Sequence, residues 1–393
     1  MSYSTLLDLE ACPRRWALSA AAYPSVWKER GYPRPPQRAT LEGTVVHLSL
    51  QRITRALVER GCPSLSDESA VSTLRELGGY TEVVLGSLEL ALQPYEGNPR
   101  ADPVLEGIHH RLSAQVPELR SRVQRLLARI RPAERRAGKW ETTVSHPGVE
   151  SRSQLLHGSY AEVEIRAIEM GWRGFADLLT LSSSRCEIRD FKTGVPKQEH
   201  ESQVRTYALL WARDSDLNPE GRLADKLVLS YNKGDIEVPA PDEREIHRLE
   251  GELQRRTAEA LANLQTDPPE ARPSRQNCKY CPVRHLCEEY WYSHARQKAS
   301  NESAKNGLGD VQIGLTGQHG PSSWDGVIES GPDLKVSGPI LLRTTSLQFE
   351  LKPGQRVRLL NVHIRAPEEE PFEERQPTIV ATMGANSEAF LLL

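Results

Sequence analysis

Two aspartates and a lysine in the middle of the chain have the residue types and spacing of a metal-dependent hydrolytic site. Asp177 lies in the stretch GFADLL, and Asp190 and Lys192 lie in EIRDFKTG. Both stretches have the pattern of strands, and a hairpin would bring the two carboxylates together. Two adjacent carboxylates repel each other unless a cation such as Mg²⁺ lies between them. The alternative is a strand with an ordinary surface ion pair, which a single D-x-K pattern does not exclude.

Side chains near the two aspartates could complete such a site. Lys192 is two residues from Asp190 and shares its strand face, so the ammonium group could orient an attacking water. Gln203 and Tyr207 are four residues apart on the following predicted helix and therefore share one of its faces. They could position Lys192 or contact a nucleic-acid backbone, although ordinary helix packing would also explain them.

Two residues earlier in the chain are weaker candidates for the same site. His47 lies on a predicted upstream helix and could be a metal ligand or an ordinary core histidine. Glu164 lies on the strand before Asp177 and is a candidate accessory acid. Neither residue indicates a function by itself.

Three of the six cysteines form a C-x2-C-x5-C pattern in the stretch NCKYCPVRHLC. They are Cys278, Cys281 and Cys287. This spacing allows three thiolates to bind one metal, and a fourth ligand is then required. His285 would complete a zinc site, whereas Cys12 would close a four-thiolate site from the other end of the chain. Cys62 and Cys186 have no partner by spacing, and Cys186 is expected to be a small core residue.

The hydrophobic periodicity predicts the elements that must position these residues. Residues 41–60 have the spacing of an amphipathic helix, and residues about 62–155 form a helix-rich insertion broken by prolines. Strands are expected at 159–170, 172–182, 185–191 and 225–234, and helices at 199–214 and 246–265. This order predicts an α/β core whose sheet is mixed.

A second and smaller domain is predicted after this core. A linker rich in glycine, serine and asparagine is expected at 299–309, between a core domain at 1–298 and a β domain at 310–393. Five or six short β-like runs predict a small OB-like barrel. Residues 306–393 hold seven basic and eleven acidic residues and few aromatic ones. Docking to a protein partner is therefore at least as well supported as binding of single-stranded DNA.

The composition of the whole chain limits the possible functions. Of its 393 residues 38% are hydrophobic, and no run of about 18 apolar residues predicts a membrane span. The first residues lack the pattern of a signal peptide, so we expect a cytoplasmic protein whose thiols are reduced. No G-x-x-x-x-G-K-[ST] motif is present, so a helicase or other ATPase would have to be a separate partner.

A basic stripe precedes the predicted sheet. Between residues 111 and 139 the chain holds nine basic residues and two acidic ones. Such a stripe can follow a phosphate backbone, but a solvated helix face is the simpler interpretation.

Together, these motifs resemble the RecB-like branch of the PD-(D/E)XK nuclease superfamily. That branch has a G-x-x-D strand, a D-x-K-T-G strand and a Q-x-x-x-Y helix, which residues 174–177, 190–194 and 203–207 match. Its G-T-x-x-H helix is matched by Gly43, Thr44 and His47. The resemblance covers about residues 1–295 and implies a restriction-endonuclease-like fold. The β domain lies outside it.

The resemblance implies a metal-dependent DNA nuclease, expected to be an exonuclease on single strands or DNA ends. Mg²⁺ or Mn²⁺ would be held by His47, Asp177, Asp190 and the carbonyl of Phe191. Lys192 would help to activate the water and to stabilise the developing charge. DNA repair, CRISPR adaptation and phage defence are the implied pathways. The competing hypothesis is a DNA-binding scaffold subunit of a larger helicase–nuclease or defence complex, with little activity of its own.

The resemblance also bears on the cysteines. Iron–sulfur members of this branch, among them CRISPR-associated adaptation exonucleases and AddB-type nucleases, have one cysteine before the nuclease core and three after it. The stretch CPRR and the late C-x2-C-x5-C match that layout. A 4Fe–4S cluster is therefore implied on Cys12, Cys278, Cys281 and Cys287, where it would staple the two ends of the nuclease domain.

Overall fold

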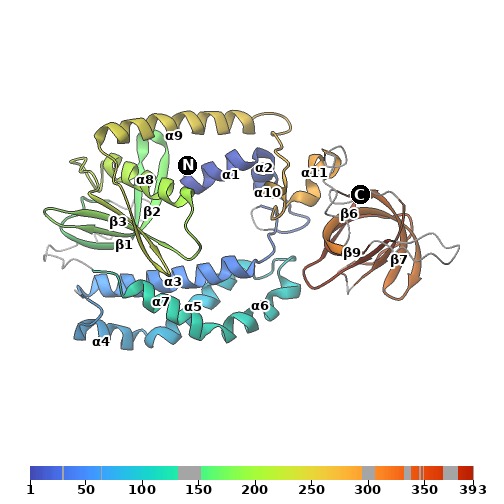
Figure 1. Ribbon diagram of the computed structural model, residues 1–393, viewed down its shortest axis with the longest axis horizontal. Coiled ribbons are helices and arrows are strands. Elements are labelled where there is room, and N and C mark those ends of the chain that lie inside the picture. The colour runs from blue at the N-terminus through green and yellow to red at the C-terminus, as the bar shows by residue number, and fades with distance from the viewer. Residues whose placement is uncertain are drawn as a thin grey trace. The chain divides into compact units, whose positions relative to one another are not determined.

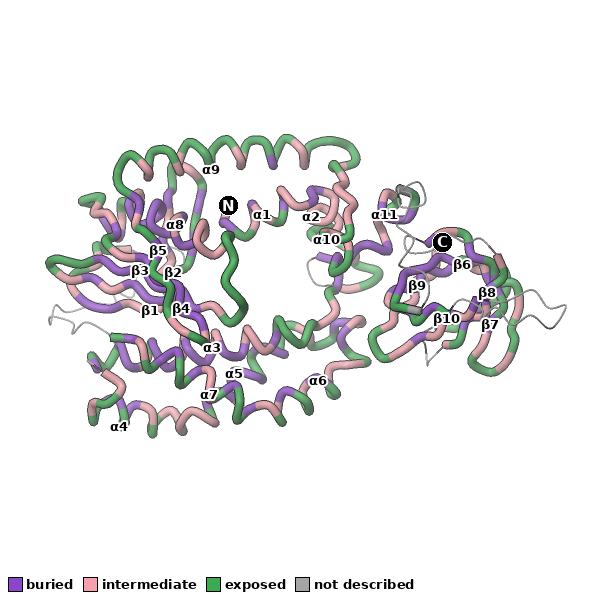
Figure 2. The backbone as a smooth tube through the Cα atoms, viewed as in Figure 1, coloured by how far each residue is buried: buried purple, intermediate pink, exposed green. Residues whose placement is uncertain are grey.

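The computed structural model of the chain describes residues 1–28, 31–62, 64–131, 152–293, 306–331, 338–344, 347, 349–365 and 379–392. The chain divides into two compact units. The first, called the α/β unit, comprises Met1–Glu10 and Pro33–Ala262, and the second, called the cysteine–barrel unit, comprises Ala11–Tyr32 and Asn263–Leu393. Figure 1 shows the elements of each unit, and Figure 2 shows that buried residues concentrate on the strands and on single faces of the helices.

A five-stranded sheet forms the centre of the α/β unit. Its strands are β1 (Gly158–Ala167), β2 (Trp172–Leu181), β3 (Cys186–Lys192), β4 (Lys226–Tyr231) and β5 (Gly234–Val238). They lie in the order β1–β2–β3–β4–β5, and only β3 and β4 run parallel. A parallel pair needs a crossover, which α8 (Gln198–Arg213) supplies. The predicted mixed α/β core is confirmed, and β5 is a strand that the periodicity did not predict.

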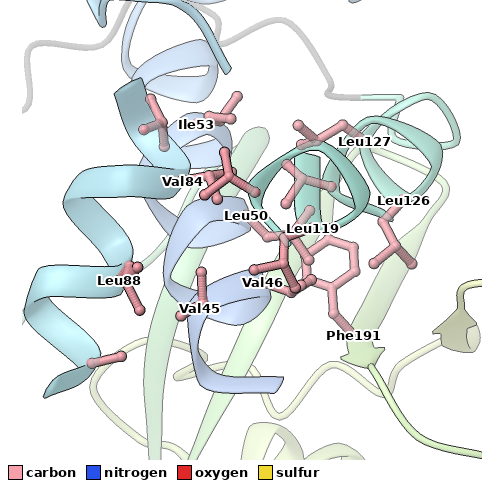
Figure 3. Packing of buried hydrophobic residues seen from close by; sticks show 14 of the residues in the cluster. Val45, Val46, Leu50, Ile53, Val84, Leu88, Leu119, Leu126, Leu127 and Phe191 are labelled. Carbon is pink, nitrogen blue, oxygen red and sulfur yellow. The ribbon is translucent and has the colours of Figure 1, made fainter. Parts of the chain in front are cut away.

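A layer of helices packs on the face of the sheet from which the Phe191 side chain projects. Its members are α3 (Arg38–Glu59), α4 (Glu68–Glu76), α5 (Gly79–Leu92), α6 (Asp102–Ala114) and α7 (Val116–Leu127). Apolar residues on one face of α3 meet those of α5 and α7, and Figure 3 shows Phe191 between Val46, Leu119 and Leu126. The insertion expected at about 62–155 thus consists of α4 to α7 as far as it is described. Residues 132–151 lie outside the described residues.

The basic stripe includes three residues of α7, Arg120, Arg122 and Arg125, and it has partners within the α/β unit. Arg122 pairs with Glu118 one turn away. The Arg125 and Arg129 side chains bind the turn between β4 and β5, at Asn232 and at the carbonyl of Tyr231. These contacts favour a helix face that is paired inside the unit over a continuous nucleic-acid surface. Arg135, Arg136 and Lys139, which the stripe also includes, lie outside the described residues.

The cysteine–barrel unit is built around a β-barrel. Its strands are β6 (Asn306–Gly320), β7 (Ser323–Ser330), β8 (Pro339–Arg343), β9 (Arg356–Arg365), β10 (Ile379–Thr382) and β11 (Glu388–Leu392). Strands β6, β7, β8, β10 and β9 pair in a closed ring in which only β8 and β10 are parallel, and β11 pairs with β9. Of the linker expected at 299–309, residues 306–309 belong to β6, and the rest lie outside the described residues.

Three short helices belong wholly to this second unit. They are α2 (Pro13–Ala20), α10 (Arg275–Cys278) and α11 (Glu288–Ser293). The two remaining helices, α1 (Tyr3–Ala11) and α9 (Glu243–Leu264), lie mostly in the α/β unit. The C-x2-C-x5-C pattern runs from α10 to α11, in the same compact unit as the barrel, although the sequence had assigned it to the core domain at 1–298. Among the described residues, no helix has the length and apolarity needed to cross a membrane.

Candidate active site and cysteine cavity

The two predicted aspartates lie on neighbouring strands and are buried. Asp177 on β2 and Asp190 on β3 have 5% and 4% of their surface exposed. The Asp177 carboxylate accepts a hydrogen bond from the backbone N–H of Phe191, which ties the two strands together beside Asp190. The Phe191 side chain packs in the helical layer, because neighbouring residues on a strand point to opposite faces. The predicted hairpin between β2 and β3 therefore exists and brings the carboxylates together.

His47 and Glu162 complete a group of three ligand-type side chains with Asp177. The His47 Nε2 atom on α3 lies 2.8 Å from Asp177 Oδ1, and this hydrogen bond raises the pKa of His47 to about 9. The donor atoms of His47, Glu162 and Asp177 all lie within 4.8 Å of one another. Burial, and then the negative charge of Asp177, raise the pKa of Glu162 to about 7.

Lys192 connects the carboxylates to α8. Its Nζ atom lies 2.6 Å from Asp190 Oδ2 and donates to Gln203 Oε1 at 2.7 Å. The Gln203 amide in turn donates to the Tyr207 hydroxyl at 2.8 Å. Burial and the neighbouring Asp177 raise the pKa of Asp190 despite the ammonium group. The four residues that the sequence associated by spacing therefore form one continuous chain of contacts.

The chemistry of this donor set fits a hard divalent cation. Carboxylate oxygens are the ligands that Mg²⁺ and Mn²⁺ prefer, and one imidazole beside them favours Mn²⁺ as an alternative to Mg²⁺. The His47 Nε2 and Asp177 Oδ1 atoms, which are hydrogen-bonded to each other, become two donor atoms for a cation once the proton between them is lost. Burial together with like charge raises the pKa of Glu162 and of Asp190, a cost that a bound cation would relieve. Phe191, whose carbonyl the resemblance includes among the ligands, lies next to this group on β3.

The glutamate of β1 that lies beside Asp177 and His47 is Glu162, and Glu164 does not join this group. Glu164 forms ion pairs with Arg166 and Arg173 instead. Glu162 lies between Ala161 and Val163, whose partners Leu178 and Ala176 flank Asp177 on β2, and it has a left-handed φ of 54°. Such a conformation is rare for a residue other than glycine, and it breaks the regular alternation of a strand. The sequence predicts Glu164 as the accessory acid, and no residue pattern distinguishes it from Glu162 two positions away.

Two motif glycines make room for other motif residues. A Cβ atom at Gly174 on β2 would lie 2.7 Å from the ring of Tyr207. A Cβ atom at Gly43 on α3 would lie 2.9 Å from Thr193 Oγ1, in the loop after β3. Both contacts are closer than carbon atoms tolerate, so the glycines allow α8 and that loop to approach the sheet and α3.

The four cysteines expected to bind one cofactor line a single cavity in the cysteine–barrel unit. They are Cys12, Cys278, Cys281 and Cys287. Cys12 precedes α2, and its sulfur accepts a hydrogen bond from the Arg15 backbone N–H at 3.4 Å. Burial raises the pKa of the Cys281 thiol to about 11 and that of Cys287 to about 12. In such surroundings the thiolate form needs a cationic partner, which a metal site supplies.

His285, the alternative fourth ligand, is engaged elsewhere. Its Nε2 atom lies 2.8 Å from the Tyr32 hydroxyl. Its ring stacks on Phe390 with centroids 3.7 Å apart and an interplanar angle of 14°. It is also not among the residues that line the cavity. The arrangement therefore fits a four-thiolate site better than a zinc site of three cysteines and one histidine.

The remaining two cysteines lie away from this cavity. Cys62 is buried in the helical layer, with its sulfur 3.8 Å from the Thr73 hydroxyl. Cys186 is fully buried at the start of β3, and burial raises the pKa of its thiol to about 12. Both are core residues.

The chain is similar to a known protein family and, over part of its length, to solved structures. A family model described as the PD-(D/E)XK nuclease superfamily matches residues 1–288, which end before the barrel strands. The crystal structure of SSO0001 shares 23% sequence identity and covers 33% of this chain and 60% of its own, with a TM-score of 0.23. The crystal structure of the tetrameric p202 HIN2 shares 10% identity over 26% and 49%, with a TM-score of 0.17. The chain thus spans less than two thirds of either structure, and no curated protein matches it.

Proposed function

Because the chain belongs to the PD-(D/E)XK nuclease superfamily, we propose that it hydrolyses phosphodiester bonds in DNA with Mg²⁺ or Mn²⁺. The observation that carries this proposal is the group of His47, Glu162 and Asp177, whose donor atoms lie within 4.8 Å of one another. Beside it, the Lys192 ammonium lies 2.6 Å from Asp190. Metal-dependent hydrolysis of a phosphodiester uses a set of hard ligands for the cation, and a fixed positive charge stabilises the charge that develops.

The ligands proposed for the cation are His47, Glu162, Asp177, Asp190 and the carbonyl of Phe191. When bound, the divalent cation would supply Lewis-acid stabilisation of the phosphate and a lower pKa for a coordinated water. The two carboxylates on β2 and β3 are held apart from bulk water, which strengthens every charge interaction between them and the substrate.

Lys192 is proposed to orient the attacking water and to stabilise charge on the phosphate oxygens. Gln203 accepts one ammonium proton and Asp190 attracts another, so the direction of the third is fixed. Tyr207 accepts from the Gln203 amide and thereby holds the amide oxygen toward Lys192. Gln203 and Tyr207 are therefore positioning residues, and Lys192 acts on the reacting atoms.

The finer features of the function are proposals from the RecB-like resemblance. They are exonucleolytic cleavage of single strands or DNA ends, a role in DNA repair, CRISPR adaptation or phage defence, and a separate helicase or ATPase as partner. The complete set of site residues, from His47 to Lys192, supports an active enzyme over a scaffold subunit.

A 4Fe–4S cluster is proposed on Cys12, Cys278, Cys281 and Cys287. The proposal is supported by the single cavity that these four thiols line and by the engagement of His285 with Tyr32. For the domains we propose a nuclease domain at 1–298 and an OB-like domain at 310–393. The closed ring of five strands, in which the third and fifth are the parallel pair, supports the OB-like assignment.

The test is cleavage of end-labelled single- and double-stranded DNA with Mg²⁺, with Mn²⁺ and with chelator. Asp190→Ala and Lys192→Ala are each expected to lower the rate at least about 100-fold, since each removes a charge that acts in the transition state. Lys226→Ala is the matched control, because Lys226 lies at the other end of the adjacent strand, opposite Glu187. Activity that survives Asp190→Ala, or that needs no divalent cation, contradicts the proposal.

A further inference from the structure

The segment that carries three of the cysteines is braced by buried charges of the barrel. Residues 278–291 are called the cysteine segment. Within it, Arg284 is 6% exposed and binds the carboxylate of Asp310 on β6 through Nε at 2.5 Å and Nη2 at 3.3 Å. The same guanidinium donates to the carbonyl of Cys281 at 3.2 Å. The ion pair therefore connects a barrel strand directly to the backbone of a proposed cluster ligand.

Asp310 is itself fixed by two further groups of the same unit. It is 4% exposed and accepts from the Tyr290 hydroxyl at 2.9 Å and from the Asn361 backbone N–H at 2.8 Å. Asn361 on β9 has a left-handed φ of 53°, and its side chain accepts from Arg284 at 3.0 Å. A buried carboxylate is tolerated only when it is paired and hydrogen-bonded in this way.

A second arginine, from β9, holds the other end of the cysteine segment. Arg358 is 3% exposed, donates to the carbonyl of His285 and lies 4.9 Å above the ring of Trp291. The Trp291 indole N–H in turn donates to the carbonyl of Arg284 at 3.0 Å. Strand β11 adds Phe390, which stacks on His285. Residues of three strands, β6, β9 and β11, thus contact the cysteine segment directly.

Among the described residues, strand β7 of the barrel offers little for nucleic acid. The exposed residues of β7 include Asp325 and Val327, and Glu329 on the same strand pairs with Arg356. Binding of single strands relies on basic grooves and exposed aromatic rings. Arg358 on β9 is buried and donates to the carbonyl of His285 in the cysteine segment, so it is not available to a nucleic acid.

We propose that the barrel is the scaffold of the cysteine segment, with Asp310 and Arg358 as positioning residues that keep the three thiols of the segment facing Cys12. This inference rests on the proposed function in one respect, the assignment of the four thiols to an iron–sulfur cluster. It gives the barrel, which lies outside the nuclease family match, an intramolecular role in cofactor retention. Outer groups that orient metal ligands commonly control metal affinity in this manner.

The test uses the full chain and two pairs of variants. Asp310→Asn and Arg358→Met remove the braces, and Asp325→Asn and Arg343→Met are matched controls at exposed barrel positions. Iron and sulfide content are measured, and chelator is added while the absorbance near ~400 nm is followed. Each brace variant is expected to lose the cluster at least about 10-fold faster than the wild type, and each control within about twofold of it.

Two further measurements keep the outcome decisive. Far-UV circular dichroism checks that each variant is folded. Should Asp310→Asn fail to fold, Arg358→Met decides, because its ionic partner Glu288 is 59% exposed and loses little when left alone. If the wild-type protein carries no iron, the cluster assignment is wrong. The proposal that the barrel positions the cysteine segment is then tested in another way. The rates of alkylation of Cys281 and Cys287 then replace the chelator rates, and the brace variants are expected to react at least about 10-fold faster. The scaffold proposal is contradicted if folded Asp310→Asn and Arg358→Met variants lose the cluster, or are alkylated in the absence of iron, at the wild-type rate.

Discussion

The carboxylate site of the α/β unit and the cysteine cavity of the second unit each bring together side chains from distant parts of the sequence, but different kinds of contact hold them in place. At the carboxylate site, strand pairing and two helices, α3 and α8, bring together residues that sequence motifs already name, with Glu162 as the exception. At the cysteine cavity, motifs name the four thiols, but the groups that hold them, such as Asp310 and Arg358, belong to no motif. Sequence motifs therefore identify the candidate ligands well. They identify the residues that hold those ligands in place only where regular secondary structure positions them.

The substitution Asp177→Asn is expected to have the largest effect on the carboxylate site and none on the cysteine cavity. The substitution removes a ligand charge and weakens the bond to His47, so DNA cleavage should fall about 10³-fold. Because the cysteine cavity lies in the other compact unit, iron content and absorbance near ~400 nm should remain at wild-type level. Loss of colour in this variant would contradict the independence of the two sites, since it would mean that the cysteine cavity depends on the carboxylate site.

The reverse experiment is Cys12→Ser. Purified wild-type protein is expected to be brown, and the variant to be pale and less stable by about 3 kcal/mol, roughly a quarter of the free energy that a structural metal site contributes. Thermal unfolding and metal analysis measure this. Bound zinc in a colourless wild type would contradict the cluster, and wild-type stability of Cys12→Ser would contradict its structural role.

A smaller effect should distinguish the two glutamates of β1. Glu162→Gln is expected to lower cleavage about 10- to 100-fold, because the carboxylate belongs to the group of His47 and Asp177. Glu164→Gln should stay within about twofold, since Glu164 is paired with arginines, and exposed pairs contribute little. Equal effects of the two substitutions would argue against the left-handed conformation at Glu162.

The smallest effects concern the motif glycines. Gly174→Ala should destabilise the protein by about 1–3 kcal/mol, because the new Cβ atom would lie 2.7 Å from the rigid ring of Tyr207. Gly43→Ala should change stability by less than about 1 kcal/mol, since the Thr193 side chain can rotate away and alanine favours the helix. Denaturant unfolding measures both, and a larger loss at Gly43 than at Gly174 would reverse this ranking.

Much of the fold follows from the sequence because its signals are local. The period of β2 and β3 and the spacing of Gln203 and Tyr207 predicted the mixed sheet, the crossover helix and the chain of contacts to Lys192. Edge strand β5 was missed because its residues are mostly exposed and carry no apolar alternation. Glu162 was missed because its role depends on one backbone angle, which no residue pattern encodes. The assignment of the cysteine segment to the barrel depends on buried ion pairs between distant residues, which single-sequence patterns do not reveal.

The discontinuity of the cysteine–barrel unit has a consequence for biosynthesis. Its first part, Ala11–Tyr32, is synthesised before residues 33–262 of the α/β unit, and its second part, from Asn263, is synthesised after them. Domains generally fold as units during synthesis, so the α/β unit can fold while the second part is still being made. Cys12 can therefore meet the other three thiols of the cavity only after Cys287 has been synthesised. Assembly of the four-thiol cavity is accordingly a late step, which follows synthesis of the whole α/β unit.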